Sequence, residues 1–232
     1  MKKILSITLI AVFAVVLLSS LTPKKKKSKQ FRGIVTYALS YDGEAISEVQ
    51  KSKLPETRVV KMYDGMMMYD ETMGPVIQTT IIKPDIDKVI VLIEAGMKKA
   101  ALTQKYSDLN NDSTEQYDTQ IDLSTDTKII AGYTCKKAVI TYTPKEGVED
   151  EEKMFTIYYS EELSDGSENK DSEYETIPGM LMEFYQVAPG MSLKMSVTEV
   201  VTGKVKDLDF YMPDDYKEFT SQEEMIKYLQ DQ

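Results

Sequence analysis

The chain has 232 residues, of which 28 are Lys or Arg and 38 are Asp or Glu, so its formal charge is −10. A nucleic-acid-binding role is not expected, because that role needs clustered positive charge to displace counterions from phosphates. The sequence has no His and one Cys, which excludes His-based catalytic triads, His-ligated zinc and an internal disulfide. After removal of any targeting segment, about 200 residues remain, enough for one domain or at most two.

The N-terminus has the pattern of an exported protein. A basic start precedes an apolar run from Ile4 to Leu18, and Ser19 and Ser20 follow it, so residues 1–22 are predicted to be a signal peptide. The run is shorter than the roughly 20 residues of a spanning helix. Lysines that follow this run oppose its translocation, so a second interpretation is that the segment is not cleaved and anchors the protein in the inner membrane. We expect the protein in the periplasm or elsewhere in the cell envelope, tethered to the inner membrane if the segment is retained.

A basic linker follows at 23–30, with lysines at 24–27 and 29. From residue 33 onward the chain has 20 basic against 38 acidic side chains, a formal charge of −18. The linker therefore has two interpretations. It contacts anionic phospholipid head groups, at about 1 kcal/mol for each basic residue near the surface, or it is a solvated spacer between the domain and the membrane or cleavage site.

The body of the chain is predicted to be rich in β-strands. Phe31 to Tyr41 alternates apolar and polar residues, as a strand with one dry face does. Further candidate strands follow, and turn pairs such as Asp64-Gly65 and Gly74-Pro75 lie between them. These strands are Thr57–Met62, Met66–Glu71, Val76–Lys83, Lys88–Glu94, Lys99–Tyr106, Lys128–Thr143, Lys153–Ser160, Gly179–Val187 and Ser192–Val205.

Helical signals are few. Residues 44–53 are compatible with a short helix or a loop, and Ser221 with Glu224 forms a capping box that begins a closing helix. The acidic stretches 108–126 and 164–172 are poor in large apolar residues, so both are predicted to be exposed loops.

The predicted fold is mainly β (α+β), with a single domain over residues 31–232. A single curved antiparallel sheet of nine to eleven strands is the simplest architecture, because a sheet of that size curls and its dry face must be covered. A half-open barrel with one or two covering helices meets this demand and leaves an apolar interior that a ligand can share.

Four short blocks carry a family resemblance. They are Phe31-Arg32-Gly33-Ile34-Val35-Thr36-Tyr37, Ile130-Ala131-Gly132-Tyr133-Thr134-Cys135-Lys136-Lys137-Ala138, Ile157-Tyr158-Tyr159-Ser160-Glu161-Glu162-Leu163 and Ile177-Pro178-Gly179-Met180-Leu181-Met182-Glu183. In this order the blocks resemble exported bacterial envelope proteins of the GLPGLI type, which have no established function. The resemblance implies a fold similar to the lipoprotein-carrier (LolA/LolB-like) half-barrel, and it implies no catalytic residues.

Apolar and methionine side chains on the predicted strands are the candidates for lining a ligand cavity. Flexible thioethers adapt to acyl chains of varying shape, although methionine is also ordinary core filler. The candidate residues are Val35, Tyr37, Leu39, Met66, Met68, Val89, Val91, Ile93, Met180, Met182 and Met195.

No catalytic or metal site is expected from the other motifs, and no cofactor. Stretches 108–119 and 165–176 begin with calcium-loop spacing but have neither the central Gly nor the closing Glu. Cys135 lies on a predicted strand without a base beside it, which favours a buried structural thiol over a redox or intermolecular disulfide role.

These observations favour a non-enzymatic envelope protein whose half-barrel binds or carries a hydrophobic ligand, either a lipid or an acylated polypeptide. The alternative is a protein-interaction or structural module, whose interior is core and whose acidic loops or sheet edge meet a partner. A hydrolase that uses carboxylates alone is a third possibility, and it needs a cleft with two carboxylates about 5 to 10 Å apart.

Overall fold

A computed structural model describes residues 29–44, 47–51, 54–108, 116–170 and 172–230. The predicted signal peptide, most of the predicted basic linker and most of the first calcium-like stretch lie outside these residues. The described strands are β1 (Gly33–Asp42), β2 (Thr57–Tyr63), β3 (Met66–Met73), β4 (Val76–Lys83), β5 (Lys88–Ala95), β6 (Lys98–Gln104), β7 (Tyr117–Ile130), β8 (Tyr133–Pro144), β9 (Lys153–Ser160), β10 (Met180–Ala188), β11 (Met191–Thr202) and β12 (Lys217–Phe219). The α-helices are α2 (Glu48–Lys51) and α4 (Gln222–Gln230).

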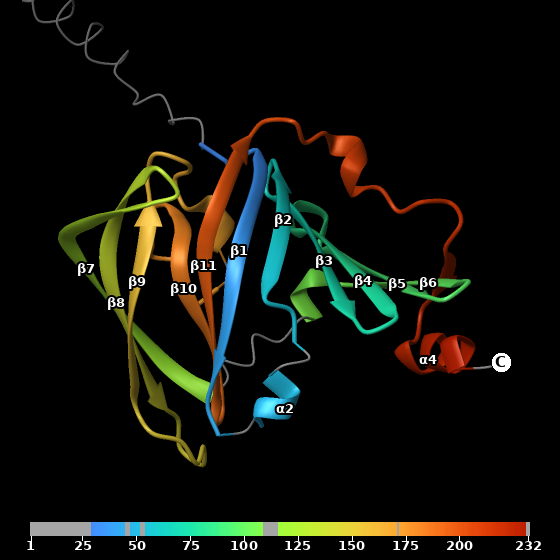
Figure 1. Cartoon of the computed structure of the whole chain (residues 1–232), viewed down its shortest axis with the longest axis horizontal. Helices are drawn as coiled ribbons and strands as arrows, with labels where there is room; N and C mark the ends of the chain where they lie inside the picture. The colour runs from blue at the N-terminus through green and yellow to red at the C-terminus, as the bar shows by residue number, and fades with distance from the viewer. Residues whose placement is uncertain (1–28, 45–46, 52–53, 109–115, 171, 231–232) are drawn as a thin grey trace, which may run out of the picture.

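All twelve described strands belong to one sheet, in the order β12-β6-β5-β4-β3-β2-β1-β11-β10-β9-β8-β7. Two antiparallel meanders, β1–β6 and β7–β11, are joined in the middle by the β1–β11 ladder, and only β12 pairs in parallel. The sheet curls strongly and is not closed (Figure 1). This open, mainly antiparallel architecture confirms the predicted mainly β class and is consistent with a half-open barrel.

The inner face of the curl holds the largest buried cluster. Alternate residues of β1, including Val35 and Tyr37, face Met62 of β2, Met182 of β10 and Met195 of β11 there. Tyr37 packs edge-on against Phe184, with 5.9 Å between the ring centroids. Strand alternation therefore places the dry face of Phe31–Tyr41 as the sequence pattern predicts.

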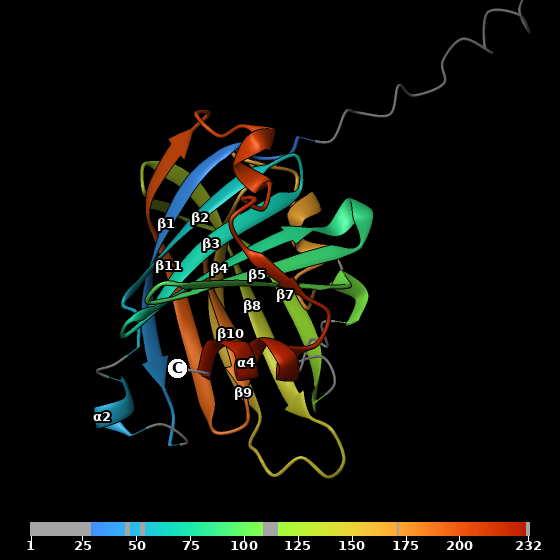
Figure 2. The same cartoon turned by 90° about the vertical axis from the view of Figure 1, so that its right-hand side faces the viewer.

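The meander β3–β6 is covered on both faces. On the outer face, the segment after β11, which contains the 3₁₀ turn Asp207–Phe210, packs Phe210 against Ile81, Ile90 and Leu92. On the opposite face, Met225 of α4 packs against Ala100 and Leu102. Figure 2 shows this outer segment crossing the strands and α4 below them. Such two-sided cover explains why Lys88–Glu94 is apolar at nearly every position.

Residues 117–126 correct one prediction, because they form a strand and not a loop. The predicted strand Lys128–Thr143 is in fact two strands, since β7 ends at Ile130 and β8 begins at Tyr133. Ala131 and Gly132 between them have φ of +49° and +86°, the paired positive values of a type I′ hairpin turn. An Ala-Gly turn lacks the usual Asn-Gly or Asp-Gly signal, and β7 is too polar for an apolar-periodicity argument.

The stretch 164–172 corrects a second prediction, since its described part is packed against the sheet. Ser164 and Asn169 are buried. The amide of Asn169 donates hydrogen bonds to the carbonyl oxygens of Ile177 (3.1 Å) and Gly179 (2.9 Å). Polar side chains are thus buried here because they satisfy main-chain groups, which a hydropathy argument does not detect.

The remaining differences are local. The closing helix begins after Ser221 as predicted, but of its apolar residues Met225 is buried while Ile226 is exposed. The short parallel strand β12 was not predicted. None of the described helices has the length and apolar character needed to span a bilayer.

The packing predicts a large difference between two neighbouring apolar residues. Ile140 of β8 is fully buried, whereas Leu123 of β7 is 55% exposed. We expect Ile140→Ala to lower the free energy of unfolding by about 2–5 kcal/mol, because it leaves a cavity in the core. Leu123→Ala is the matched control, with an expected change within about 0.5 kcal/mol. Urea denaturation of both variants measures the difference, and equal losses would contradict the difference in burial between the two positions.

Candidate functional site

The structure brings six of the predicted cavity residues together. Val35, Tyr37, Leu39, Met180, Met182 and Met195 are all buried in the inner-face cluster. Val89, Val91 and Ile93 alternate along β5, and Ile93 reaches the cluster under α4. Met66 and Met68 instead pack with the outer-face cluster around Phe210, while Met67 between them packs with the inner one.

A small cavity borders the same inner-face cluster. A cavity of about 10 Å³ lies between Met62, Met67, Phe31 and Glu168. One water molecule needs about 10–15 Å³. Side chains and the connection between β9 and β10 therefore fill this part of the inner face.

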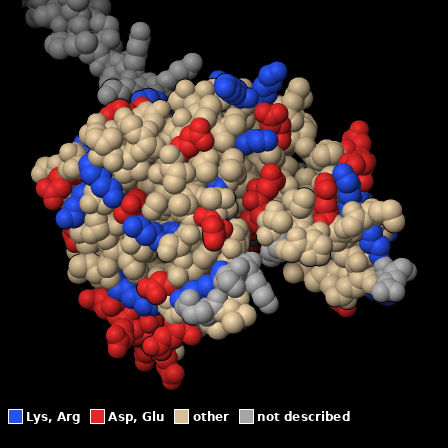
Figure 3. Space-filling view, viewed as in Figure 1, with Lys and Arg blue, Asp and Glu red and all other residues tan. Residues whose placement is uncertain are grey.

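A much larger hollow lies at one end of the sheet, and we call it the acidic cleft. Its volume is about 830 Å³. It is formed by the end of β1, the β10–β11 turn and the β8–β9 connection with the start of β9. Figure 3 shows acidic side chains gathered at this lower end of the molecule. The lining residues with ionisable side chains are Asp42, Glu44, Glu149, Asp150, Glu151, Glu152 and Lys153.

Asp150 is the anchored carboxylate of the acidic cleft. It accepts hydrogen bonds from the Lys153 ammonium at 2.6 Å, the main-chain N–H of Glu151 at 2.8 Å and the Tyr117 hydroxyl. Burial by itself raises the pKa of Asp150, but these three donors outweigh it and lower the pKa to about 2. The same environment, burial first and Asp150 second, raises the pKa of Tyr117. Asp150 is thus a structural anion that joins the cleft to the first residue of β7.

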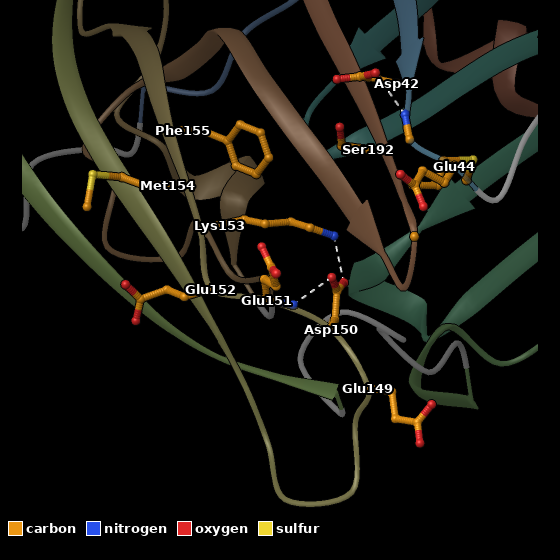
Figure 4. Close-up of a pocket in the computed structure, with 13 residues that line it drawn as sticks. Asp42, Glu44, Glu149, Asp150, Glu151, Glu152, Lys153, Met154, Phe155 and Ser192 are labelled. Atoms are coloured by element: carbon orange, nitrogen blue, oxygen red, sulfur yellow. Dashed lines mark hydrogen bonds and ion pairs between the residues drawn. The ribbon is translucent and has the colours of Figure 1, made fainter.

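The other carboxylates of the acidic cleft do not converge. Glu149 and Glu152 point away from the Asp150–Lys153 pair in different directions (Figure 4). No group of three His, Cys, Asp or Glu side chains in the described residues is arranged to hold a metal ion. The cleft consequently presents diffuse negative charge, which suits a broad cationic surface better than a single ion.

Strand β7 forms an open edge of the sheet beside the cleft. Within the described residues it pairs with β8 alone, so one row of its main-chain N–H and C=O groups has no strand partner. Register with β8 is regular from Tyr117 to Leu123 and shifts before Thr127. The first seven residues of β7 are therefore a regular template for another strand.

Acidic side chains are spaced along this edge. Asp118 and Asp122 lie four residues apart on one face of the strand, with Gln120 between them on that face, and Asp126 lies in the irregular part. The Asp118 side chain is 79% exposed and makes a loose 3.7 Å ion pair with Lys145. Asp118 lies opposite Thr143 of β8, whose hydroxyl donates a 3.2 Å hydrogen bond to Glu152 of the acidic cleft, so the acidic edge adjoins the cleft. These residues lie in a stretch that the sequence predicts to be a loop, so sequence reasoning does not place Asp118 and Asp122 on one face of a strand.

Cys135 is fully buried in the inner cluster, and burial raises the pKa of its thiol. Lys136 is turned to an ion pair with Glu161 at 2.8 Å and does not activate the thiol. The geometry therefore supports the structural role that the sequence favours for this cysteine.

Comparison with known proteins assigns no family to this chain. No protein-family description matches it, and no curated protein matches its sequence.

Asp150 generates a pH-dependent stability prediction. Since its pKa is depressed in the folded state, its contribution is complete above the ordinary Asp pKa and is lost as the pH falls toward 2. We expect Asp150→Asn to cost about 1–2 kcal/mol of unfolding free energy at pH 7, and the difference from wild type to shrink below pH 4. Thermal unfolding across this range measures it, with the exposed Glu149→Gln as the matched control. A constant difference down to pH 2 would contradict the anchoring role.

Proposed function

We propose that the protein is a non-enzymatic interaction module of the cell envelope, which binds a basic, extended segment of a partner along the β7 edge and the acidic cleft. The observation that carries this proposal is the open edge of β7, which adjoins the cleft where Thr143, opposite Asp118, donates a hydrogen bond to Glu152. The envelope location rests on the N-terminal pattern and on the resemblance to GLPGLI-type proteins. The absence of His from the sequence supports a binding role over catalysis.

Main-chain pairing supplies the affinity in this proposal. An added strand satisfies the outward N–H and C=O groups of β7, and its alternate side chains meet the two faces of the edge. On the face of Ile121 and Leu123, an apolar partner residue covers half-exposed aliphatic surface. On the other face, a Lys or Arg of the partner meets Asp118 or Asp122.

Charge restricts which strand fits. Charged edge residues and a register shift are devices by which proteins avoid edge-to-edge association. Here the charges are all of one sign over Tyr117–Leu123, so they repel a second copy of β7 and attract a basic segment. The net charge of −18 from residue 33 onward acts in the same direction at longer range.

Binding of a synthetic peptide tests this proposal. The probe is an acetylated eight-residue peptide of alternating Lys and Val, titrated by isothermal calorimetry at low and moderate salt. We expect binding that weakens with salt. The double variant Asp118→Asn/Asp122→Asn should lose about 0.2–1 kcal/mol for each removed charge, which is roughly twofold to thirtyfold in Kd.

Two controls separate strand pairing from general charge attraction. Asp214→Asn/Glu218→Gln removes two carboxylates at the opposite end of the sheet, near and within β12, and should leave the Kd almost unchanged. The same peptide with methyl groups on alternate main-chain nitrogens keeps its charge but cannot pair with β7. Equal binding of the methylated peptide, or of a Glu-Val peptide, would overturn the proposal.

A hydrophobic ligand in the half-barrel is the second candidate function, with a lipid or an acylated polypeptide as the ligand. It is favoured by the gathering of six predicted cavity residues in one inner-face cluster, three of them methionines. It requires the β9–β10 connection to move off this face. Native mass spectrometry of protein purified from its envelope without detergent tests it. A co-purifying lipid would support a carrier, whereas a clean apo mass with no uptake of added phospholipid would exclude it.

A further inference from the structure

The connection between β9 and β10 crosses the inner face of the sheet, and we call its described residues, 161–170 and 172–179, the crossing segment. At one end of the segment, the main-chain N–H of Asp165 donates a hydrogen bond of 3.0 Å to the carbonyl oxygen of Lys29. At the other end, the Tyr174 hydroxyl lies 3.0 Å from that of Tyr142 in β8. Gly166, with φ of +82°, sits so close that a Cβ there would lie 2.2 Å from the Ile177 carbonyl oxygen. The segment is therefore closely packed and covers part of the inner face of the sheet.

Glu168 lies on the underside of this cover. Its Oε1 accepts a hydrogen bond from the Ser164 hydroxyl. Its Oε2 is buried and has no hydrogen-bond partner in the described part of the chain. The carboxyl group borders the 10 Å³ cavity together with Phe31, Met62 and Met67. An ionised carboxylate in these surroundings has lost most of its water and has gained only the Ser164 hydroxyl and its own main-chain N–H as donors, which is a poor exchange.

The groups that face Glu168 do not offset this cost. Asp165 of the same segment adds like charge, and Tyr37 of β1 is a neutral phenol whose own pKa is raised, by burial first and Glu168 second. The residues that β2 and β3 present to the cavity are methionines and Gly65, and Gln30 precedes β1. The cation Arg58, whose charge acts on Tyr37, is paired with Glu71.

We propose that Glu168 is a pH-sensitive latch, which holds the crossing segment on the inner face when protonated and releases it when ionised. Loss of the proton to solvent places a charge against Met62, Met67 and Phe31, and the charge regains water only if the segment lifts. Lifting exposes the apolar cluster that contains Met180 and Met182. This inference is independent of partner binding at β7.

The direction of the pH dependence follows from the burial of the group. Burial raises the pKa of Glu168 in the closed state, and the Ser164 hydrogen bond opposes this only in part. Closure is therefore fully favoured below the ordinary Glu pKa, and it weakens as the pH rises through that value toward the raised one. The segment is tighter under mildly acidic conditions and looser at neutral and alkaline pH.

Hydrogen exchange with mass spectrometry tests the latch on the full-length protein. Glu168→Gln keeps the hydrogen-bonding shape without the charge, so at pH 8 its amides in 161–179 should exchange more slowly than wild type. Each unit by which the pKa is raised corresponds to about tenfold in the opening equilibrium. At pH 4.5 the two proteins should exchange alike. Comparison at one pH removes the intrinsic pH dependence of exchange.

Glu175→Gln, an exposed carboxyl in the same segment, is the matched control and should exchange like wild type at both pH values. Equal exchange of wild type and Glu168→Gln at pH 8 would overturn the latch. If Glu168→Gln fails to fold, wild type alone decides. Protection of 161–179 relative to β1 and β11, after correction for intrinsic rates, must fall between pH 5 and pH 8, and constant protection would refute the proposal.

Discussion

The ladder between β1 and β11 is the constraint on which the rest of the structure depends. It runs from Gly33 opposite Thr202 to Asp42 opposite Ser192, and it joins two meanders that otherwise share no strand pairing. Because both meanders twist in the same sense, joining them edge to edge makes a sheet long enough to curl. The curl creates the inner face, and the crossing segment is needed because that face is apolar.

The two ends of the same sheet are treated differently. At one end, β6 pairs over Ala100–Leu102 with β12 and packs its face against helix α4, so the last described strand there is only three residues long. At the other end, β7 is fourteen residues long and carries its protection as charge and as a register shift. A charged edge repels strands of like charge but attracts strands of opposite charge, whereas an edge covered by another element excludes every added strand. This asymmetry is what makes β7, and not β12, the candidate for selective recognition.

Much of the fold could be predicted from periodicity, and the exceptions have identifiable causes. The ranges Val76–Lys83 and Lys153–Ser160 match β4 and β9 because their apolar positions alternate between defined turns. Periodicity does not predict strand β7, because an edge strand exposed to water needs few apolar residues. Periodicity also does not predict the burial of Asn169, because its two carbonyl partners are brought beside it only by the fold.

The candidate site shows the same division. Sequence placed Val35, Tyr37 and Leu39 on the dry face, since one strand fixes their common side. It could not place Met66 and Met68 relative to Met67, because a slip of one residue reverses every side chain of a strand. The acidic surface depends on the pairing of Asp118 with Thr143 of β8, whose hydroxyl donates a hydrogen bond to Glu152 of the cleft. No local pattern reports such a contact.

The pairing of β1 with β11 also has a consequence for biogenesis. Between 150 and 169 residues separate these partners along the chain, so an emerging polypeptide presents the first meander long before the strand that completes it. Until β11 arrives, one side of β1 and the apolar face beneath it stay open to other chains. A protein built in this order benefits from being held unfolded until its last strands are available. Passage through a narrow export channel imposes that condition on any chain that uses it, with folding beginning only on the far side.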